Sequence, residues 1–365
     1  MKKRRFAAFL GAMTLAVSLL GGCGSTSSST TGSTDSADAS TTSADTATTA
    51  EADSSGDLKT VRINQAFQSL LYLPLYVADD AGFFKEEGIQ VERSTAGGGP
   101  QSWAAVVGGS ADFALGDPVF VAMSHAEGGS GVVFATIQNA PTVWIVGNEK
   151  IDMSKDLSQL AGKTIITGAE PDTDWALFEW LKNKYGDDGS SFTETTTSIG
   201  SQIAPVLAGE ADFATSCEPV ISEGIAQGLN EVFCFADVED LTPMAFSCLT
   251  TSDEFIKDHP DEAQGVMNAI EKACQYIYNN TDEAIEIAKK EFPDTDADIV
   301  KASVQRMIDC KGYPEHAEVS EKAWENNMKL ALISGNIKEY PADYSSYETN
   351  VGPSVEMAEK AKAGE

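Results

Sequence analysis

The hydrophobic residues of the chain follow two different periodicities. Between residues 60 and 250, short apolar runs typical of strands alternate with segments whose apolar residues recur every three or four positions, as in helices. The predicted strands are 60–67, 89–93, 132–136, 142–147, 164–167, 192–197, 231–235 and 244–250. The predicted helices are 70–81, 102–108, 119–127, 174–185 and 201–208. This alternation predicts an α/β fold with parallel sheets.

One pattern within this alternation occurs twice. Residues 106–119 read VVGGSADFALGDPV, and residues 206–220 read VLAGEADFATSCEPV. Each copy predicts a helix end, a glycine turn and a short buried strand, followed by an acid before a proline: Asp117 in the first copy and Glu218 in the second. In open α/β sheets, ligands bind beyond the carboxyl ends of the strands. The repeat therefore predicts two lobes that point Asp117 and Glu218 at a shared cleft.

The first lobe is expected to be built from two separate segments of the chain and the second lobe from one. The strand at 244–250 is predicted to return to the first lobe, which gives residues 58–148 and 245–365 to the first lobe and residues 149–244 to the second. The remaining chain carries apolar residues at helical spacing and is expected to pack on the first lobe and on the hinge. Its predicted helices are 261–279, 281–291, 297–308 and 320–334.

The first 57 residues have a different composition. Residues 1–22 begin with Lys and Arg and continue with a short apolar run, which is the pattern of a signal peptide. Residues 20–23 resemble the lipobox of bacterial lipoproteins, which implies that Cys23 becomes the first mature residue and carries acyl chains. Residues 23–57 are rich in Ser, Thr and acids and are expected to be a disordered linker. The expected location is the extracytoplasmic face of the cell membrane.

Charge and motifs exclude several functions. The formal net charge of −31 argues against binding to nucleic acid or to anionic lipid. The chain has three histidines without metal-ligand spacing and no CxxC, HExxH or GxSxG motif, so neither an enzyme nor a cofactor or metal is expected. The five cysteines after Cys23 are widely spaced and suggest buried apolar side chains, although Cys217, beside Glu218, is a candidate for the cleft.

Three segments point to a family. Residues 72–78 (YLPLYVA), 82–89 (GFFKEEGI) and 108–114 (GGSADFA) resemble substrate-binding proteins of ABC importers, in the branch that includes nitrate, sulfonate, taurine and thiamine-pyrimidine binders. The resemblance implies a type II periplasmic-binding-protein fold, in which two α/β lobes close like a hinge on a small ligand. It also implies an ABC permease and ATPase as partners. We expect a monomer.

The candidate ligand site follows from the predicted strand ends and helix starts. In the first lobe it comprises Gln65, Phe67, Tyr72, Gly98, Gly99, Asp117 and Gln138. In the second it comprises Asp172, Thr173, Trp175 and Glu218, with Trp144 near the hinge. Some of these residues have an equally simple structural reading. The aromatic residues suit the core, Asp117 suits a helix cap, and the glycines suit a tight turn as well as an anion site.

The chemistry of this set suggests a ligand class. It contains no Lys or Arg, whereas its acids and aromatic rings suit a flat heteroaromatic with N–H donors, such as a thiamine-pyrimidine precursor. Nitrate, sulfonate and taurine are alternatives within the same family. A pyrimidine-precursor synthase-like enzyme and a sensory or adhesion lipoprotein are alternatives of other classes.

Overall fold

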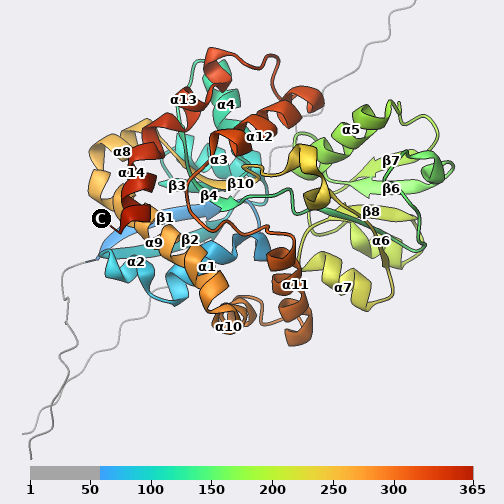
Figure 1. The fold of residues 1–365 in the computed structure, drawn as a ribbon, viewed down its shortest axis with the longest axis horizontal. Coiled ribbons are helices and arrows are strands. Elements are labelled where there is room, and N and C mark those ends of the chain that lie inside the picture. Colours follow the sequence, from blue (N-terminus) through green and yellow to red (C-terminus); the bar gives the residue numbers. More distant parts are fainter. Residues whose placement is uncertain (1–57, 365) are drawn as a thin grey trace, which may run out of the picture. The chain divides into compact units, whose positions relative to one another are not determined.

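The computed structural model describes residues 58–364, which contain two five-stranded sheets (Figure 1). The predicted signal peptide 1–22, Cys23 and the linker up to residue 57 lie outside the described residues. Within residues 58–364, no helix has the length and apolar character needed to cross a membrane.

The first sheet has the strand order β2-β1-β3-β10-β4. Its strands are β1 (Lys59–Gln65), β2 (Ile89–Thr95), β3 (Phe113–Gly116), β4 (Val132–Gln138) and β10 (Ser247–Thr251). Strand β1 pairs in parallel with β2 and β3, whereas β10 runs antiparallel between β3 and β4. The predicted return of the chain to the first lobe at 244–250 is therefore confirmed.

Helices connect the strands of this sheet. They are α1 (Leu73–Asp80), which continues a short 3-10 turn at Leu70–Tyr72, α2 (Phe83–Glu86), α3 (Gly99–Val107) and α4 (Val119–Ala126). Pro74 lies in the first turn of α1, where its missing N–H group leaves no helical hydrogen bond unmade. The carboxyl ends of β1 and β3 and the start of α3 lie at one edge of the sheet, as in other α/β lobes.

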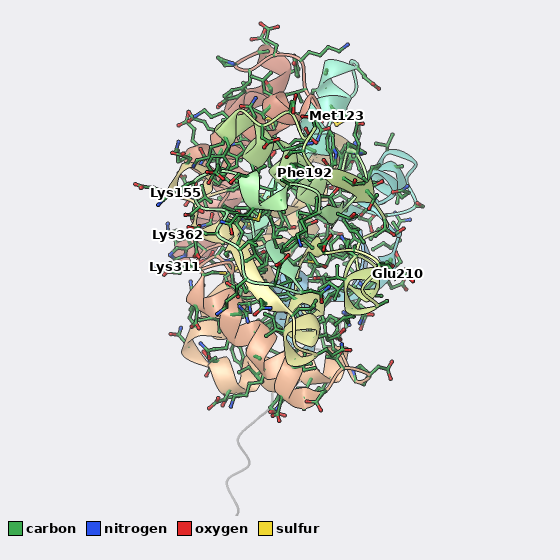
Figure 2. All side chains as sticks on the ribbon, turned by 90° about the vertical axis from the view of Figure 1, so that its right-hand side faces the viewer. Met123, Lys155, Phe192, Glu210, Lys311 and Lys362 are labelled. Carbon is green, nitrogen blue, oxygen red and sulfur yellow. The ribbon has the colours of Figure 1, made fainter. Side chains whose placement is uncertain are left out.

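The second sheet has the strand order β7-β6-β8-β5-β9. Its strands are β5 (Trp144–Gly147), β6 (Thr164–Thr167), β7 (Thr193–Thr196), β8 (Phe213–Ser216) and β9 (Asn230–Cys234). The helices of this lobe are α5 (Thr173–Tyr185), α6 (Ile203–Leu207) and α7 (Val220–Ala226). Figure 2 looks onto this lobe, with Phe192 inside its outline, where it packs on Phe178, and with exposed Glu210 at one edge.

Strand β5 corrects the predicted boundary between the lobes. It pairs with β8 and β9 of the second sheet, so the chain crosses between residues 139 and 143 and not after residue 148. The apolar run at 142–147 correctly predicts a strand, but its periodicity carries no information about which sheet completes it. Trp144 begins β5 directly after the crossover and is 1% exposed.

The chain beyond β10 is helical. Its helices are α8 (Asp253–Asp258), α9 (Pro260–Asn279), α10 (Thr281–Glu291), α11 (Ala297–Asp309), α12 (Glu321–Ser334), α13 (Tyr347–Asn350) and α14 (Gly352–Ala363). Helix α9 packs on α1, α2 and β2, as expected for the first lobe. However, α11 packs on α7 and α12 packs on α5, so these two helices also hold the second lobe (Figure 1).

The sequence repeat is a repeat of structure down to single hydrogen bonds. The N–H of Gly109 donates to the carbonyl of Val106 over 2.9 Å, and the N–H of Gly209 donates to that of Val206 over 3.0 Å. Both glycines have a φ near +73°, where a side chain would be strained. This register places Cys217, and not Glu218, at the position that matches Asp117. Glu218 is one inserted residue.

Candidate functional site

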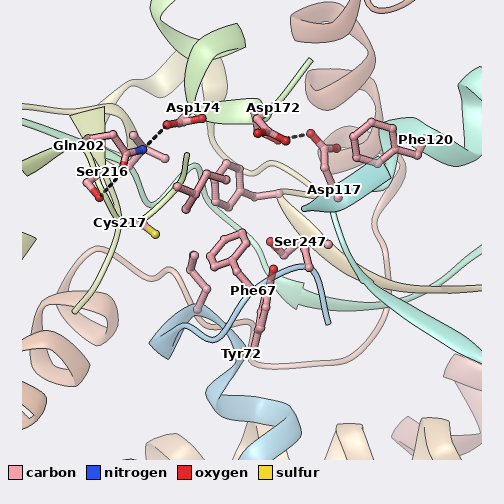
Figure 3. A pocket seen from close by; sticks show the side chains of 18 residues that line it. Phe67, Tyr72, Asp117, Phe120, Asp172, Asp174, Gln202, Ser216, Cys217 and Ser247 are labelled. Carbon is pink, nitrogen blue, oxygen red and sulfur yellow. Dashed lines mark hydrogen bonds between the residues drawn. The ribbon is translucent and has the colours of Figure 1, made fainter. Parts of the chain in front are cut away.

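A pocket lies between the strand ends of the two sheets (Figure 3). Its volume is about 50 Å³, which is enough for a few water molecules. Six predicted residues line it: Phe67, Tyr72, Gly99, Asp117, Asp172 and Thr173. Cys217 lines it as well, and among the described residues that form the wall there is no Lys or Arg.

Asp117 lies between β3 and α4 and joins three elements. Its Oδ1 accepts hydrogen bonds from the N–H of Val119 over 2.9 Å and from Nδ2 of Asn327 in α12 over 3.3 Å. Its Oδ2 accepts a hydrogen bond from the hydroxyl of Thr173 in the second lobe. Burial raises the pKa of this carboxyl group, and the three hydrogen bonds oppose that effect. Asp117 is thus both a helix cap and a wall of the pocket.

Asp174, in the first turn of α5, is held from within the second lobe. Its carboxylate accepts hydrogen bonds from the N–H of Trp175 and from Nε2 of Gln202, both over 3.0 Å. The hydroxyl of Thr215 donates a third over 3.4 Å. Gln202 is fixed in turn because its Oε1 accepts from the N–H of Gly200 over 2.7 Å. Burial raises the pKa of Asp174, and these donors limit the rise.

Asp172 differs from both of these acids. It holds the N-cap position of α5 with an extended backbone, yet its side chain accepts no capping hydrogen bond. No hydrogen bond joins its carboxylate to another residue of the described chain, while its own N–H donates to the carbonyl of Ala169 over 2.8 Å. Burial raises the pKa of Asp172 to about 7, and the nearby carboxylates of Asp174 and Asp117 add to the rise.

The first lobe supplies rings and hydroxyl groups. The rings of Phe67 and Tyr72 are in contact, with centroids 5.5 Å apart, and Phe120 of α4 closes the side near Asp117 (Figure 3). The hydroxyls of Tyr72 and of Ser247 in β10 have no hydrogen-bond partner within residues 58–364 and face the pocket. Tyr72 is 1% exposed and Ser247 is 6% exposed.

Four predicted residues lie outside the pocket and stabilise the fold around it. Gln65 donates to the hydroxyl of Thr95 and accepts from that of Tyr76. Gln138 is fully buried and donates to the carbonyl of Leu71 over 2.7 Å at the crossover. Gly98 precedes α3, and Trp175 packs against the core beside Asp174.

The placement of Glu218 overturns the prediction that it faces a ligand opposite Asp117. Glu218 is fully buried away from the pocket, where its carboxylate accepts from the N–H and hydroxyl of Ser222 and from the hydroxyl of Ser303. Nε of Arg306 in α11 lies 3.0 Å from its Oε1. Because Glu218 is itself the residue inserted after Cys217, its side chain points to the hinge side. Burial raises the pKa of Glu218, and the positive charge of Arg306 opposes this rise.

Several lining residues were not predicted. They are Ala66, Leu71, Gly116, Phe120, Val143, Asp174, Ile199, Gln202, Ser216, Phe246 and Ser247. The repeat contains a signal for some of them, because its register matches Gly116 with Ser216 and Asp117 with Cys217. Phe246 and Ser247 come from the returning strand, and only the tertiary fold brings them to the pocket. Among residues 58–364, no group of three or more His, Cys, Asp and Glu side chains has the arrangement of a metal site.

Comparisons with known proteins agree with this geometry. The chain is 27% identical over 288 residues to YtlA, a proposed binding protein of Bacillus subtilis (strain 168), which covers 78% of this chain and 86% of YtlA. The ligand-binding component of an ABC-type import system from Staphylococcus aureus has a TM-score of 0.67 at 14% identity, over 83% of this chain and 99% of its own.

The periplasmic nitrate-binding protein NrtA of Synechocystis PCC 6803 has a TM-score of 0.66 at 12% identity, over 84% and 89% of the two chains. These structures show the two-lobed fold of periplasmic binding proteins, as predicted. The family model described as NMT1/THI5 like matches residues 71–284, which include strands of both sheets. Because this match spans more than half of the chain, the protein belongs to the NMT1/THI5-like family.

Proposed function

We propose that the protein is the substrate-binding component of an ABC importer. It captures a small ligand outside the cytoplasm and delivers it to a permease that works with an ATPase. The observation that carries this proposal is the pocket between the strand ends of the two lobes, to which both lobes contribute polar side chains. The relatives in the comparisons are described as binding proteins rather than as enzymes, which supports the same function.

The ligand class follows from the pocket wall. Three aromatic side chains, Phe67, Tyr72 and Phe120, offer flat apolar surface, and the acids supply hydrogen-bond acceptors. A site for nitrate or sulfonate needs donors, and no Lys or Arg lines the described wall. A flat heteroaromatic with N–H donors, such as a thiamine-pyrimidine precursor, therefore fits better than an anion.

Calorimetry and thermal unfolding test this function. We expect an aminopyrimidine such as 4-amino-5-hydroxymethyl-2-methylpyrimidine to stabilise the body of the protein by about 2.7 kcal/mol at 100 times its Kd. Nitrate, taurine and ethanesulfonate should give no shift. Replacement of Phe67 by alanine should weaken binding, whereas replacement of the exposed Val107 on α3 should not. Tight binding of a sulfonate with none of the pyrimidine would contradict the proposed ligand class.

The anchor and the assembly are part of the proposal. Cys23, followed by the linker to residue 57, suits a lipid-anchored receptor that acts as a monomer. In the native host, the Cys23→Ser variant should leave the membrane fraction, while Cys217→Ser, a buried control, should stay there. Retention of Cys23→Ser in the membrane would contradict anchoring through this residue.

A further inference from the structure

The three carboxylates that line the pocket are not equally available to a ligand. Both oxygens of Asp117 accept hydrogen bonds from protein donors, namely Thr173, Asn327 and the N–H of Val119. The oxygens of Asp174 likewise accept from within the second lobe. Protein donors hold such a carboxylate in place. A ligand that displaced these donors would lose part of its binding free energy, because the broken hydrogen bonds offset the new ones. Asp117 and Asp174 therefore shape the wall.

Asp172 is the acid that remains. Aspartate at an N-cap position normally accepts a hydrogen bond from the first turn of the helix. Here the side chain of Asp172 does not cap α5, and the carboxylate lies on the pocket wall (Figure 3). The loop that carries it is held in place, because Nδ2 of Asn336 donates to the carbonyl of Pro171 over 3.2 Å and the N–H of Asp172 donates to Ala169. The carboxylate is thus held in position without a hydrogen-bond partner among residues 58–364.

The first-lobe wall of the pocket carries two hydroxyl groups that also lack a hydrogen-bond partner among the described residues. Tyr72 is almost completely buried and Ser247 is more than nine-tenths buried, and the structure gives neither hydroxyl a partner among the described residues. Neither hydroxyl oxygen belongs to the fully buried polar atoms that lack a partner, so both are open to the pocket and free to bond a polar atom there. These two groups lie on the first-lobe side and Asp172 lies on the second-lobe side.

We propose that Asp172 selects ligands that present a positive charge or paired N–H donors, while Tyr72 and Ser247 bind polar atoms at the other end of the same ligand. This inference rests on the proposed function and assigns its specificity to three residues. An amidinium or protonated amino-heteroaromatic group matches the two oxygens of Asp172. The flat ring between the ends matches Phe67 and Phe120.

Two probes of nearly the same shape test the charge preference: benzamidine, an aromatic cation, and benzamide, its neutral counterpart. Calorimetry at pH 8 should show that the full body of the protein prefers benzamidine by at least tenfold. The Asp172→Asn variant should lose this preference and bind the two probes within about threefold of each other. The matched control is Glu170→Gln, which removes the same charge from an exposed position in the same loop and should keep the preference.

The Tyr72→Phe variant tests the other wall. Neither probe has a polar atom at the end away from its amidine or amide group, so this variant should bind both probes as the unmodified protein does. It should lose only the additional affinity that 4-hydroxybenzamidine has over benzamidine, because the 4-hydroxyl group is the atom that Tyr72 would bind. A preference that survives in Asp172→Asn, or that is lost in Glu170→Gln, would overturn the assignment. Equal binding of the two probes by the unmodified protein would also overturn it, although binding of either one would leave the proposed receptor function intact. Thermal unfolding of each variant establishes that it is folded.

Discussion

Replacement of Asp172 by asparagine should stabilise the ligand-free protein at neutral and alkaline pH. The pocket raises the pKa of Asp172 from 3.8 to about 7, mainly by burial. In the unfolded chain this carboxyl group ionises near 3.9, so between these values the folded state holds a proton that the unfolded state has lost. Stability therefore falls as the pH rises from about 4 to about 7, and it remains lowered above that range. Asparagine has no charge to bury.

The size of the effect follows from the same pKa. A change from 3.8 to about 7 corresponds to at most about 4 kcal/mol. The side chain of Asp172 is only partly buried, and solvent screening reduces this to about 1–2 kcal/mol. The variant should thus be about 1–2 kcal/mol more stable than the unmodified protein at pH 8 and equally stable at pH 4.

Urea unfolding at the two pH values measures this difference through the transition midpoint, provided that the slope of the transition stays the same. Glu170→Gln serves as the control, since it removes an exposed carboxylate two residues away. The reasoning is refuted if Asp172→Asn has the same effect at pH 4 and pH 8, or if it destabilises the protein at pH 8.

Three further changes should alter stability, each measured by urea unfolding. Glu218→Ala should cost about 3 kcal/mol, because Arg306 and two serine hydroxyls lose their buried partner; an unchanged midpoint would contradict this. Lys311→Gly should add about 0.5–1 kcal/mol, since Lys311 has a φ of 54°, and a loss would show that its side chain matters more. Gly147→Ala should cost at least about 1–3 kcal/mol, because a Cβ would lie 2.1 Å from the Phe213 ring; full stability would refute the tight contact.

Local patterns predicted most of the fold because they depend on neighbours in the sequence. The strands at 89–93 and 164–167 and the helix at 174–185 correspond to β2, β6 and α5 within a few residues. The sheet to which a strand belongs depends on partners far along the chain, and for this reason β5 was assigned to the wrong lobe. The packing of α11 and α12 on the second lobe is non-local in the same way.

The candidate site was predicted best where a residue directly follows a strand or begins a helix. Phe67, Asp117 and Asp172 occupy such positions and line the pocket. Glu218 follows a strand too, but it is the one residue inserted in the second copy of the repeat and does not line the pocket. The register of the repeat, which matches Asp117 with Cys217, contained the signal for this. Ser247 was not predicted because its strand, β10, lies more than one hundred residues further along the chain than the neighbouring strands β3 and β4 of the first sheet. That the carboxylate of Asp172 has no hydrogen-bond partner within the described residues 58–364 is a property of the folded state, and no local pattern predicts it.

The two walls of the pocket share one architecture but differ in chemistry. At the matched position the first lobe carries the carboxylate of Asp117 and the second carries the thiol of Cys217, whose pKa burial raises to about 12 and which is therefore uncharged at neutral pH. A molecule that reversed its two ends in the pocket would exchange these neighbours. The cavity thus has a polarity of its own, and an asymmetric ligand has one preferred direction in it. Two lobes that share one fold but differ at a matched position can therefore bind a small asymmetric molecule in a single orientation.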